Sequence, residues 1–241
     1  MGTRIVPEGV SIEPMSESFI LWRCLHGGPL SRETIDELPF DKRADWETHR
    51  AINVPLLRKI IKTYGTCAML AKARNQGVGF LRFYPKTVCS MEEAGGLCLQ
   101  QRFPAGPSER LIERRFPPLE EIQEKTLMVH CLMTGSPFQD NNSYQRKGIG
   151  TQMVRRLIQW ARENGWEGIE AMTNEDLEIL YANTGQAGRR FWEKVGFRVV
   201  KTETEPGFQG EFLKKMLEQA KAQGLNPKDV QNKYTMRIEL T

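Results

Sequence analysis

The sequence feature that most constrains the fold is a glycine turn that separates an apolar run from an amphipathic helix. The apolar run covers residues 126–133, and the helix begins near Thr151. The turn consists of Gln145, Arg146, Lys147, Gly148, Ile149 and Gly150. Its glycines let the backbone approach a ligand closely, and the first amides of the helix have no intrahelical acceptor. Together with the helix dipole and the two basic side chains, these amides predict a site for a phosphate-bearing ligand.

Two well-known phosphate motifs do not fit this turn. A Walker loop needs a lysine between Gly150 and Thr151, and the sequence has none there. A dinucleotide-binding fingerprint needs a third glycine where Met153 stands. Taken alone, the hexamer is equally compatible with a ligand-free turn between a strand and a helix. The assignment therefore depends on the rest of the chain.

The chain around the turn alternates between predicted helices and strands. Helices are expected at residues 31–38, 45–64, 119–125, 151–164, 186–194 and 209–224. Strands are expected at residues 10–12, 67–73, 78–84, 126–133, 169–172, 198–202 and 234–240. Gly65 is expected to end the first long helix, which Pro55 either starts or kinks. The proline-containing stretch 86–125 is expected to form an irregular excursion outside the core.

The composition is that of an ordinary globular protein, with 39% hydrophobic and 27% charged residues. A formal net charge of +4 neither requires nor excludes a polyanionic partner. Five cysteines without a CxxC pair and three scattered histidines predict no zinc or iron–sulfur site. No apolar run approaches the about 18–20 residues of a membrane span, and the N-terminus lacks a hydrophobic signal core. We therefore expect a cytoplasmic protein with reduced thiols and no membrane partner.

A second motif follows the glycine turn at the distance of a helix and a strand. It reads Phe191-Trp192-Glu193-Lys194-Val195-Gly196-Phe197. This motif resembles the aromatic signature, ending in Gly-Phe, of the GNAT-type acyl-CoA-dependent N-acetyltransferase superfamily. The turn, written as Gln145-x-x-Gly148-x-Gly150, resembles the pyrophosphate loop of the same superfamily. The resemblance covers residues 126–201, and the two motifs together are much more specific than either alone.

The resemblance implies an α+β fold with a mixed, mostly antiparallel central sheet, flanked by helices and splayed between the fourth and fifth strands. A single GNAT-like domain would span residues 1–241, with an irregular insertion at 86–125 and an added helix at 209–224. The implied cofactor is acetyl-CoA or another acyl-CoA, with no metal. Its pyrophosphate would bind the glycine turn, and its pantetheine would run along the apolar strand. The implied cofactor-binding residues are Cys131, Leu132, Met133, Gln145, Arg146, Lys147, Gly148, Ile149, Gly150 and Thr151.

The catalytic residues depart from the pattern of the superfamily. Trp192 occupies the place of its tyrosine general acid, and Leu127 lies near the place where the histone-modifying branch carries a glutamate base. An indole N–H is not a proton donor at neutral pH. The catalytic residues therefore stay unknown, with His130, Tyr144 and Tyr181 as candidates. A structural role is the alternative for each candidate, and proton transfer through a water relay is another.

The resemblance implies an N-acetyltransferase that moves an acetyl or other acyl group from acyl-CoA to a primary amine of a small molecule or protein. The amine would attack the thioester directly. The alternative is a catalytically degenerate acyl-CoA-binding module or sensor, because the usual tyrosine is missing. Nucleic-acid binding is set aside, since paired arginines on helices are usually solvated; the arginines concerned are Arg155, Arg156, Arg189 and Arg190. The expected partner is the amine acceptor, and a homodimer is left open.

Overall fold

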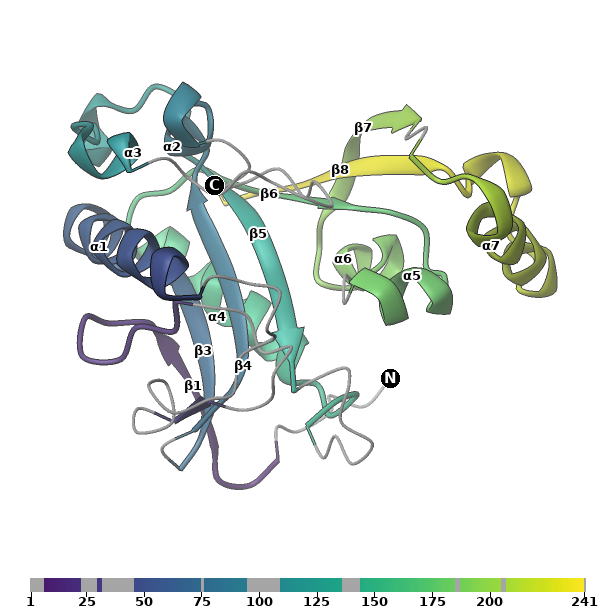
Figure 1. The fold of residues 1–241 in the computed structure, drawn as a ribbon, viewed down its shortest axis with the longest axis horizontal. Helices are drawn as coiled ribbons and strands as arrows, with labels where there is room; N and C mark the ends of the chain where they lie inside the picture. The colour runs from purple at the N-terminus through teal and green to yellow at the C-terminus, as the bar shows by residue number, and fades with distance from the viewer. Residues whose placement is uncertain are drawn as a thin grey trace. The chain divides into compact units, whose positions relative to one another are not determined.

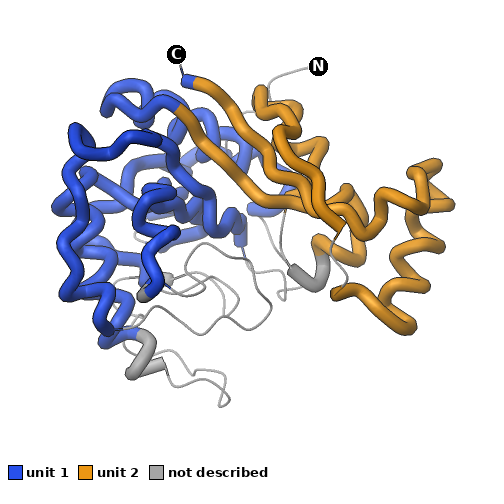
Figure 2. Tube along the Cα trace, turned by 90° about the horizontal axis from the view of Figure 1, so that it is seen from above, with its two compact units in different colours: residues 1–167, 240–241 blue, residues 168–239 orange. Residues whose placement is uncertain are grey.

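The structure, a computed structural model, describes residues 7–22, 30–31, 46–74, 76–94, 109–135, 144–184, 187–204 and 207–240. The chain forms two compact units, which are coloured separately in Figure 2. Unit 1 contains residues 1–167 and 240–241, and unit 2 contains residues 168–239. Each unit has its own strands and helices and is described by itself.

Unit 1 is built on an antiparallel sheet in which β1, β3, β4 and β5 lie side by side in that order. The strands of this unit are β1 (Val10–Pro14), β2 (Leu30–Ser31), β3 (Ala68–Ala73), β4 (Gln76–Pro85) and β5 (Thr126–Thr134). The short β2 pairs with the beginning of β4. The strands expected at 67–73 and 78–84 are present as β3 and β4, which pair across a turn in which Arg74 has a φ of 55°. Every residue of β4 except the first is buried, so this strand forms the centre of the unit.

Two long helices cover this sheet, with α1 (Trp46–Tyr64) in front of the strands and α4 (Ile149–Glu163) behind them in Figure 1. Pro55 lies inside α1, and the helix ends where Gly65 donates its N–H to the Ile61 carbonyl at 2.7 Å. The buried face of α4 is the apolar stripe expected from the sequence: Met153, Val154, Leu157, Ile158 and Ala161. Trp160 of α4 packs on Phe83 of β4 with ring centroids 5.6 Å apart, which fixes the helix to the centre of the sheet.

Short elements connect β4 to β5. They are α2 (Lys86–Cys89), the 3-10 helix η1 (Glu92–Ala94), α3 (Arg110–Glu113) and the 3-10 helix η2 (Leu119–Glu121). The helix expected at 119–125 is therefore a single 3-10 turn, because the backbone becomes extended at Ile122. Leu111, Phe116 and Ile122 are buried, so the expectation that residues 86–125 lie outside the core is wrong for the described part of this connection. The Tyr64 hydroxyl of α1 donates to the Pro117 carbonyl at 2.8 Å and ties the two segments together.

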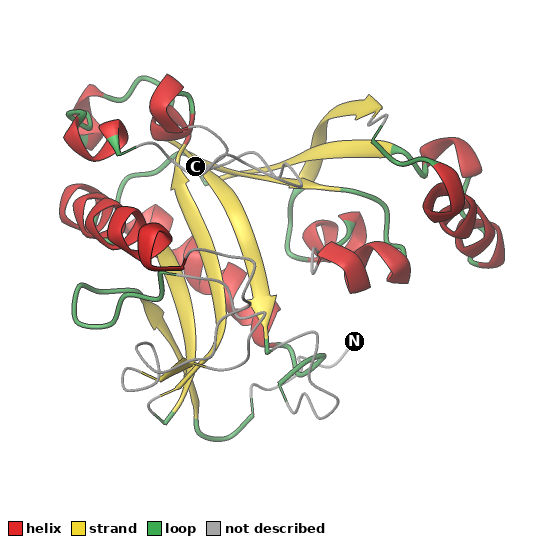
Figure 3. Cartoon of the chain, in the orientation of Figure 1, coloured by secondary structure: helices red, strands yellow, loops and turns green. Residues whose placement is uncertain are grey.

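Unit 2 contains a three-stranded antiparallel sheet with β8 between β6 and β7. Its strands are β6 (Gly168–Thr173), β7 (Arg198–Thr204) and β8 (Asn232–Glu239). Its helices, red in Figure 3, are α5 (Glu178–Thr184), α6 (Arg189–Lys194), α7 (Gly210–Ala222) and the 3-10 helix η3 (Pro227–Asp229). The added helix expected at 209–224 is present as α7, whereas the helix expected at 186–194 begins later, at Arg189.

A separate hydrophobic core joins α5 and α7 of unit 2. Its buried members are Leu177, Leu180, Phe208, Met216, Ala220 and Val230. The Ile179 N–H also donates to the Gln219 side-chain oxygen at 3.1 Å, which links the two helices directly. The two helices therefore stabilise each other through a core that neither could bury alone.

These observations confirm the α+β class, with mostly antiparallel strands flanked by helices. The short helix expected at 31–38 lies outside the described residues apart from Ser31, which belongs to β2. The predicted splay concerns strands of different units and stays a prediction, as does the description of residues 1–241 as one domain.

Candidate functional site

The glycine turn enters α4 through a conformation that glycine adopts readily. Gly148 is the N-cap of the helix and has φ 82° and ψ −1°, in the left-handed region. Its carbonyl accepts the N–H of Gln152 at 3.1 Å, which is the first intrahelical hydrogen bond. The amides of Ile149, Gly150 and Thr151 have no intrahelical acceptor, and none of the other described residues accepts a hydrogen bond from them. Three donors are thus available at the start of α4, as an anion site requires.

Charged side chains accompany these amides. Arg146 and Lys147 are exposed, whereas Tyr144 and Gln145 of the same turn are half-buried. Arg146 has a positive φ of 56°, so the turn contains a second left-handed residue just before Gly148. The helix dipole adds partial positive charge at the same end of α4. The residues of the turn therefore fit a diphosphate group.

Strand β5 carries a β-bulge at His130. Arg82 of β4 pairs with Cys131, whereas the next residue, Phe83, pairs with Val129, so β5 advances two residues where β4 advances one. His130 is the extra residue. His130 and the two residues after it are half-exposed, while the residues on either side of these three are buried. The bulge thus leaves the middle of β5 partly exposed, where the resemblance implies that the pantetheine would run.

The three catalytic candidates belong to two different units. His130 and Tyr144 lie in unit 1, and Tyr181 lies on α5 of unit 2. The His130 ring packs against the Tyr84 ring with centroids 5.8 Å apart and an interplanar angle of 59°. Cys131, beside His130, is half-exposed, whereas Met133 is buried. His130 is the one candidate that lies at the bulge.

Strand β4 contains two buried polar residues, Arg82 and Tyr84, which were not among the residues singled out from the sequence. The Arg82 guanidinium donates to the Leu21 carbonyl and hydrogen-bonds the Tyr84 hydroxyl. Burial raises the pKa of the Tyr84 phenol above its usual value, and the nearby Arg82 lowers it in part. Burial also raises the pKa of the Cys67 thiol to about 12, so both groups stay protonated at neutral pH. The sequence did contain a signal for Arg82, namely a lone arginine within an apolar strand. A buried cation normally has a specific partner, so such an arginine indicates a specific role.

Trp192 is a core residue of unit 2. It is 3% exposed and makes edge contacts with Phe191 and Phe197, at centroid distances of 5.2 and 5.0 Å. Its carbonyl accepts the Phe197 N–H at 3.1 Å, next to Gly196, which has a φ of 100°. The aromatic motif therefore forms the end of α6 and packs this helix into the core of unit 2. The indole supplies no proton-transfer group.

A buried carboxylate, Glu175, follows β6 and was also missed. Its Oε1 accepts the Tyr234 hydroxyl at 2.6 Å and lies 3.5 Å from Nη1 of Arg189. Burial and the hydrogen bond to Glu175 raise the pKa of Tyr234 to about 12. The Arg189 guanidinium also lies over the Tyr234 ring, 5.0 Å from its centroid. This network connects β8 to the start of α6.

The segment that contains α5 begins and ends beside the end of β6. The Arg189 N–H donates to the Asn174 carbonyl at 3.0 Å, and the Arg190 N–H donates to the Asp176 carboxylate at 2.8 Å. Asp176 therefore caps the N-terminus of α6 from across the inserted segment. These bonds keep α6 attached to the end of β6 although a helix intervenes in the sequence.

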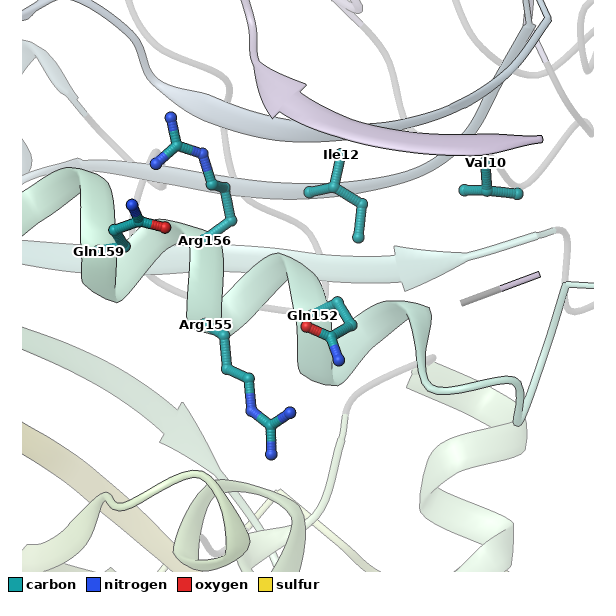
Figure 4. Close-up of a pocket in the computed structure, with 6 residues that line it drawn as sticks. All are labelled: Val10, Ile12, Gln152, Arg155, Arg156 and Gln159. Carbon is teal, nitrogen blue, oxygen red and sulfur yellow. The ribbon is translucent and has the colours of Figure 1, made fainter. Parts of the chain in front are cut away.

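A hollow of about 300 Å³ lies between β1 and α4 (Figure 4). It is lined by Val10, Ile12, Gln152, Arg155, Arg156 and Gln159. Figure 4 shows the two aliphatic side chains of β1 pointing toward α4, while Arg155 points away from β1. Arg156 forms an ion pair with Glu163 at 3.5 Å. The hollow contains no residue of the glycine turn, so we do not assign it to the acyl-CoA site.

Three further expectations can be compared with the structure. Among the described residues, no group of three or more His, Cys, Asp or Glu side chains is placed to hold a metal ion. No helix in the described part of the chain is long and apolar enough to cross a membrane. Cys89 forms a disulfide, so the expectation of reduced thiols is wrong for this residue.

Residues 141–197 match the model of the acetyltransferase (GNAT) family. The match contains the glycine turn, α4 and the aromatic motif, which are the features that carried the resemblance. The resemblance of this chain to the GNAT-type acetyltransferases is thereby confirmed. A search of curated proteins found no match.

Solved structures of acetyltransferases also align with the chain. A GNAT family acetyltransferase from Elizabethkingia anophelis with acetyl-CoA bound is 16% identical, with 97% of this chain and 99% of that chain covered and a TM-score of 0.44. The ribosomal-protein-S18-alanine N-acetyltransferase from Escherichia coli is 7% identical, with coverage of 96% and 94% and a TM-score of 0.44. An agmatine N-acetyltransferase is 12% identical, with coverage of 96% and 100% and a TM-score of 0.47. All three TM-scores are below 0.5.

Proposed function

We propose that this protein is an acyl-CoA-dependent N-acetyltransferase, which moves the acetyl group of acetyl-CoA to a primary amine of a small molecule or a protein. The observation that supports this most strongly is the start of α4. There the left-handed Gly148 precedes three amides without an intrahelical acceptor, within the segment that matches the GNAT family. A phosphate-binding helix start in such a segment favours acyl-CoA over other phosphate ligands.

The residues of unit 1 fit acetyl-CoA. The amides from Ile149 to Thr151, with the side chains of Arg146 and Lys147, would hold its pyrophosphate. The half-exposed Cys131 and Leu132 would line its pantetheine at the bulge. When bound, acetyl-CoA supplies a thioester carbonyl: the C–N bond to the amine forms, the C–S bond breaks, and the amine proton is lost.

The protein accelerates such a reaction mainly by holding the amine beside the thioester carbon, which replaces a bimolecular encounter by a positioned one. His130 is the candidate proton acceptor, because an imidazole takes up a proton near neutral pH and this residue lies at the bulge. It would accept the amine proton directly or through one water molecule.

The missing tyrosine at position 192 is compatible with turnover. A thiol has a pKa of about 8.5, so a thiolate leaves without complete protonation. A general acid typically contributes about 100- to 10,000-fold to a rate, and its loss slows a reaction without preventing it. We therefore expect acyl transfer to occur, with a lower rate than a tyrosine at this position would give.

The burial of Trp192 also motivates the second candidate, a degenerate acyl-CoA-binding module or sensor. The two candidates share the cofactor site and differ in turnover. Thiol release from acetyl-CoA, measured against a panel of primary amines, separates them. Amine-dependent release supports the enzyme, whereas calorimetric binding of acetyl-CoA without release on any amine supports the module, and absence of binding contradicts both.

A further inference from the structure

The guanidinium of Arg82 is buried, and no carboxylate of the described residues pairs with it. Arg82 is 7% exposed, and its recorded contacts are the Leu21 carbonyl, the Tyr84 hydroxyl and the Phe80 ring, whose centroid lies 5.2 Å away. Its Nε is buried and has no hydrogen-bond acceptor. No carboxylate of the described residues forms an ion pair with it. A full positive charge therefore lies in the interior, and its contacts among the described residues are with neutral groups.

Such an arrangement is costly, because burial removes the hydration of the cation and only an anion restores a comparable interaction. The chain supplies anions elsewhere. Arg237, which is more exposed than Arg82, has both Glu170 at 2.9 Å and Glu239 at 2.7 Å. The partly buried Lys72 is likewise paired, with Glu13. Arg237 and Lys72 thus each have a carboxylate beside them, and Arg82 lacks one among the described residues. A bound anion would supply it.

The position of Arg82 connects it to the proposed reaction. It pairs directly with Cys131 in the register of β4 and β5, next to the bulge at His130. Residues that pair across antiparallel strands have side chains on the same face, with Cβ atoms about 5 Å apart. Phe83, which follows Arg82, packs toward Trp160 of α4, so Arg82 lies on the opposite face of the sheet from α4. The proposed pyrophosphate site lies at the start of α4. Arg82 lies on the other face of the sheet, which α4 does not cover.

We propose that Arg82 binds the carboxylate of the acyl acceptor, so that the acceptor is a small primary amine that carries a carboxylate, such as an amino acid. This inference rests on the proposed function. A guanidinium binds a carboxylate through two parallel N–H donors, and the unpartnered Nε offers one of them. The carboxylate would neutralise the buried charge and hold the amine nitrogen beside the bulge. Arg82 then selects the acceptor, and the proton transfer belongs to other groups.

The test uses matched acceptors and two variants of the full chain. Each acceptor pair consists of an amino acid and its carboxamide, with the same amine and side chain. For the wild type we expect the kcat/KM of the amino acid to exceed that of the amide by about 100-fold, which corresponds to about 2.8 kcal/mol. Arg82→Gln should abolish this preference mainly by raising KM for the amino acid. Arg82→Lys, which keeps the charge but loses the planar pair of donors, should retain a part of it.

A merely structural Arg82 gives a different result, because both members of each acceptor pair would then lose activity together. That outcome, or a wild-type enzyme that uses amides as well as amino acids, overturns the inference while leaving the transferase proposal in place. Calorimetric titration of the CoA-saturated protein with the same acceptor pairs measures the preference without turnover. If acetyl-CoA itself does not bind to the wild type, the proposed function fails and this inference fails with it.

Discussion

Replacement of Gly148 by glutamate tests the cofactor site most sharply. The new carboxylate would stand at the N-cap of α4, beside the three amides that the pyrophosphate is proposed to use. Two unit charges about 4 Å apart repel by about 4 kcal/mol at an effective dielectric constant of about 20. The turn is partly exposed and solvent screens part of this term, so we expect about 2–4 kcal/mol, or a loss of affinity of about 30- to 1,000-fold.

Gly148→Gln is the matched control, because glutamine has nearly the shape of glutamate without its charge. Both variants suffer from the left-handed φ of 82°, which costs a residue with a Cβ about 1–2 kcal/mol. In a chain of 241 residues each kcal/mol lowers Tm by about 2–4 °C, so both variants should melt lower by similar amounts. The ratio of their acetyl-CoA dissociation constants then isolates the charge.

The assay is calorimetric titration with acetyl-CoA at low and high salt. The account predicts that Gly148→Glu binds far more weakly than Gly148→Gln, and that added salt reduces the difference. Equal affinities in two folded variants would refute the placement of an anion at this turn.

Three other predictions concern stability. Trp192→Phe should lower the free energy of unfolding by about 1–3 kcal/mol through loss of packing, and it should change kcat less than about threefold. Thermal unfolding and a steady-state assay measure the two effects. A large loss of kcat alone would mean that the indole takes part in catalysis. Asp176→Ala should cost about 1 kcal/mol by removing the cap on the Arg190 N–H, while Asp176→Asn retains most of it; equal destabilisation by both changes would contradict the capping role. The pKa of Tyr234, raised to about 12 in the folded state, predicts stability that is complete below pH 10 and lost as the pH rises toward 12. Tyr234→Phe should therefore reduce the loss of unfolding free energy between pH 8 and 10.5 by about 1 kcal/mol in urea titrations, and an unchanged loss would show that this phenol does not carry the effect.

The sequence predicted the elements whose patterns are local. The stripe of α4 repeats with the helical period, Gly65 and Gly148 mark helix ends by their conformation, and the apolar runs at 67–73 and 78–84 mark β3 and β4. These features depend on neighbours within a few positions, so one sequence contains the necessary information. The glycine turn was predicted for the same reason.

The features that the sequence did not predict depend on contacts between distant segments. The bulge at His130 appears only in the pairing register of β5 with β4. The burial of Arg82 depends on the segment around Leu21, which is 61 positions away. The late start of α6 follows from its attachment to Asn174 and Asp176 across the inserted α5. Such features depend on tertiary packing, which cannot be predicted from the hydrophobic periodicity within one segment.

For the catalytic candidates, too, the sequence indicates the chemistry of a side chain, whereas its surroundings come from the structure. His130 was singled out by its chemistry, and the structure adds its place at the bulge and its contact with Tyr84. Tyr181 was chosen for its nearness in sequence to the aromatic motif, and it lies in a helix that packs with α7 in unit 2. Tyr181 therefore stays a candidate in the same unit as the aromatic motif.

The measurement that tests the central claim most directly is the stoichiometry of acyl transfer. Thiol released from acetyl-CoA and N-acetylated amine, quantified by mass spectrometry in the same reaction, should rise together in a one-to-one ratio. Both should fall in Gly148→Glu and persist at a higher level in Gly148→Gln. Thiol release without acetylated amine, or tight binding of acetyl-CoA with neither product for any primary amine, would contradict the account.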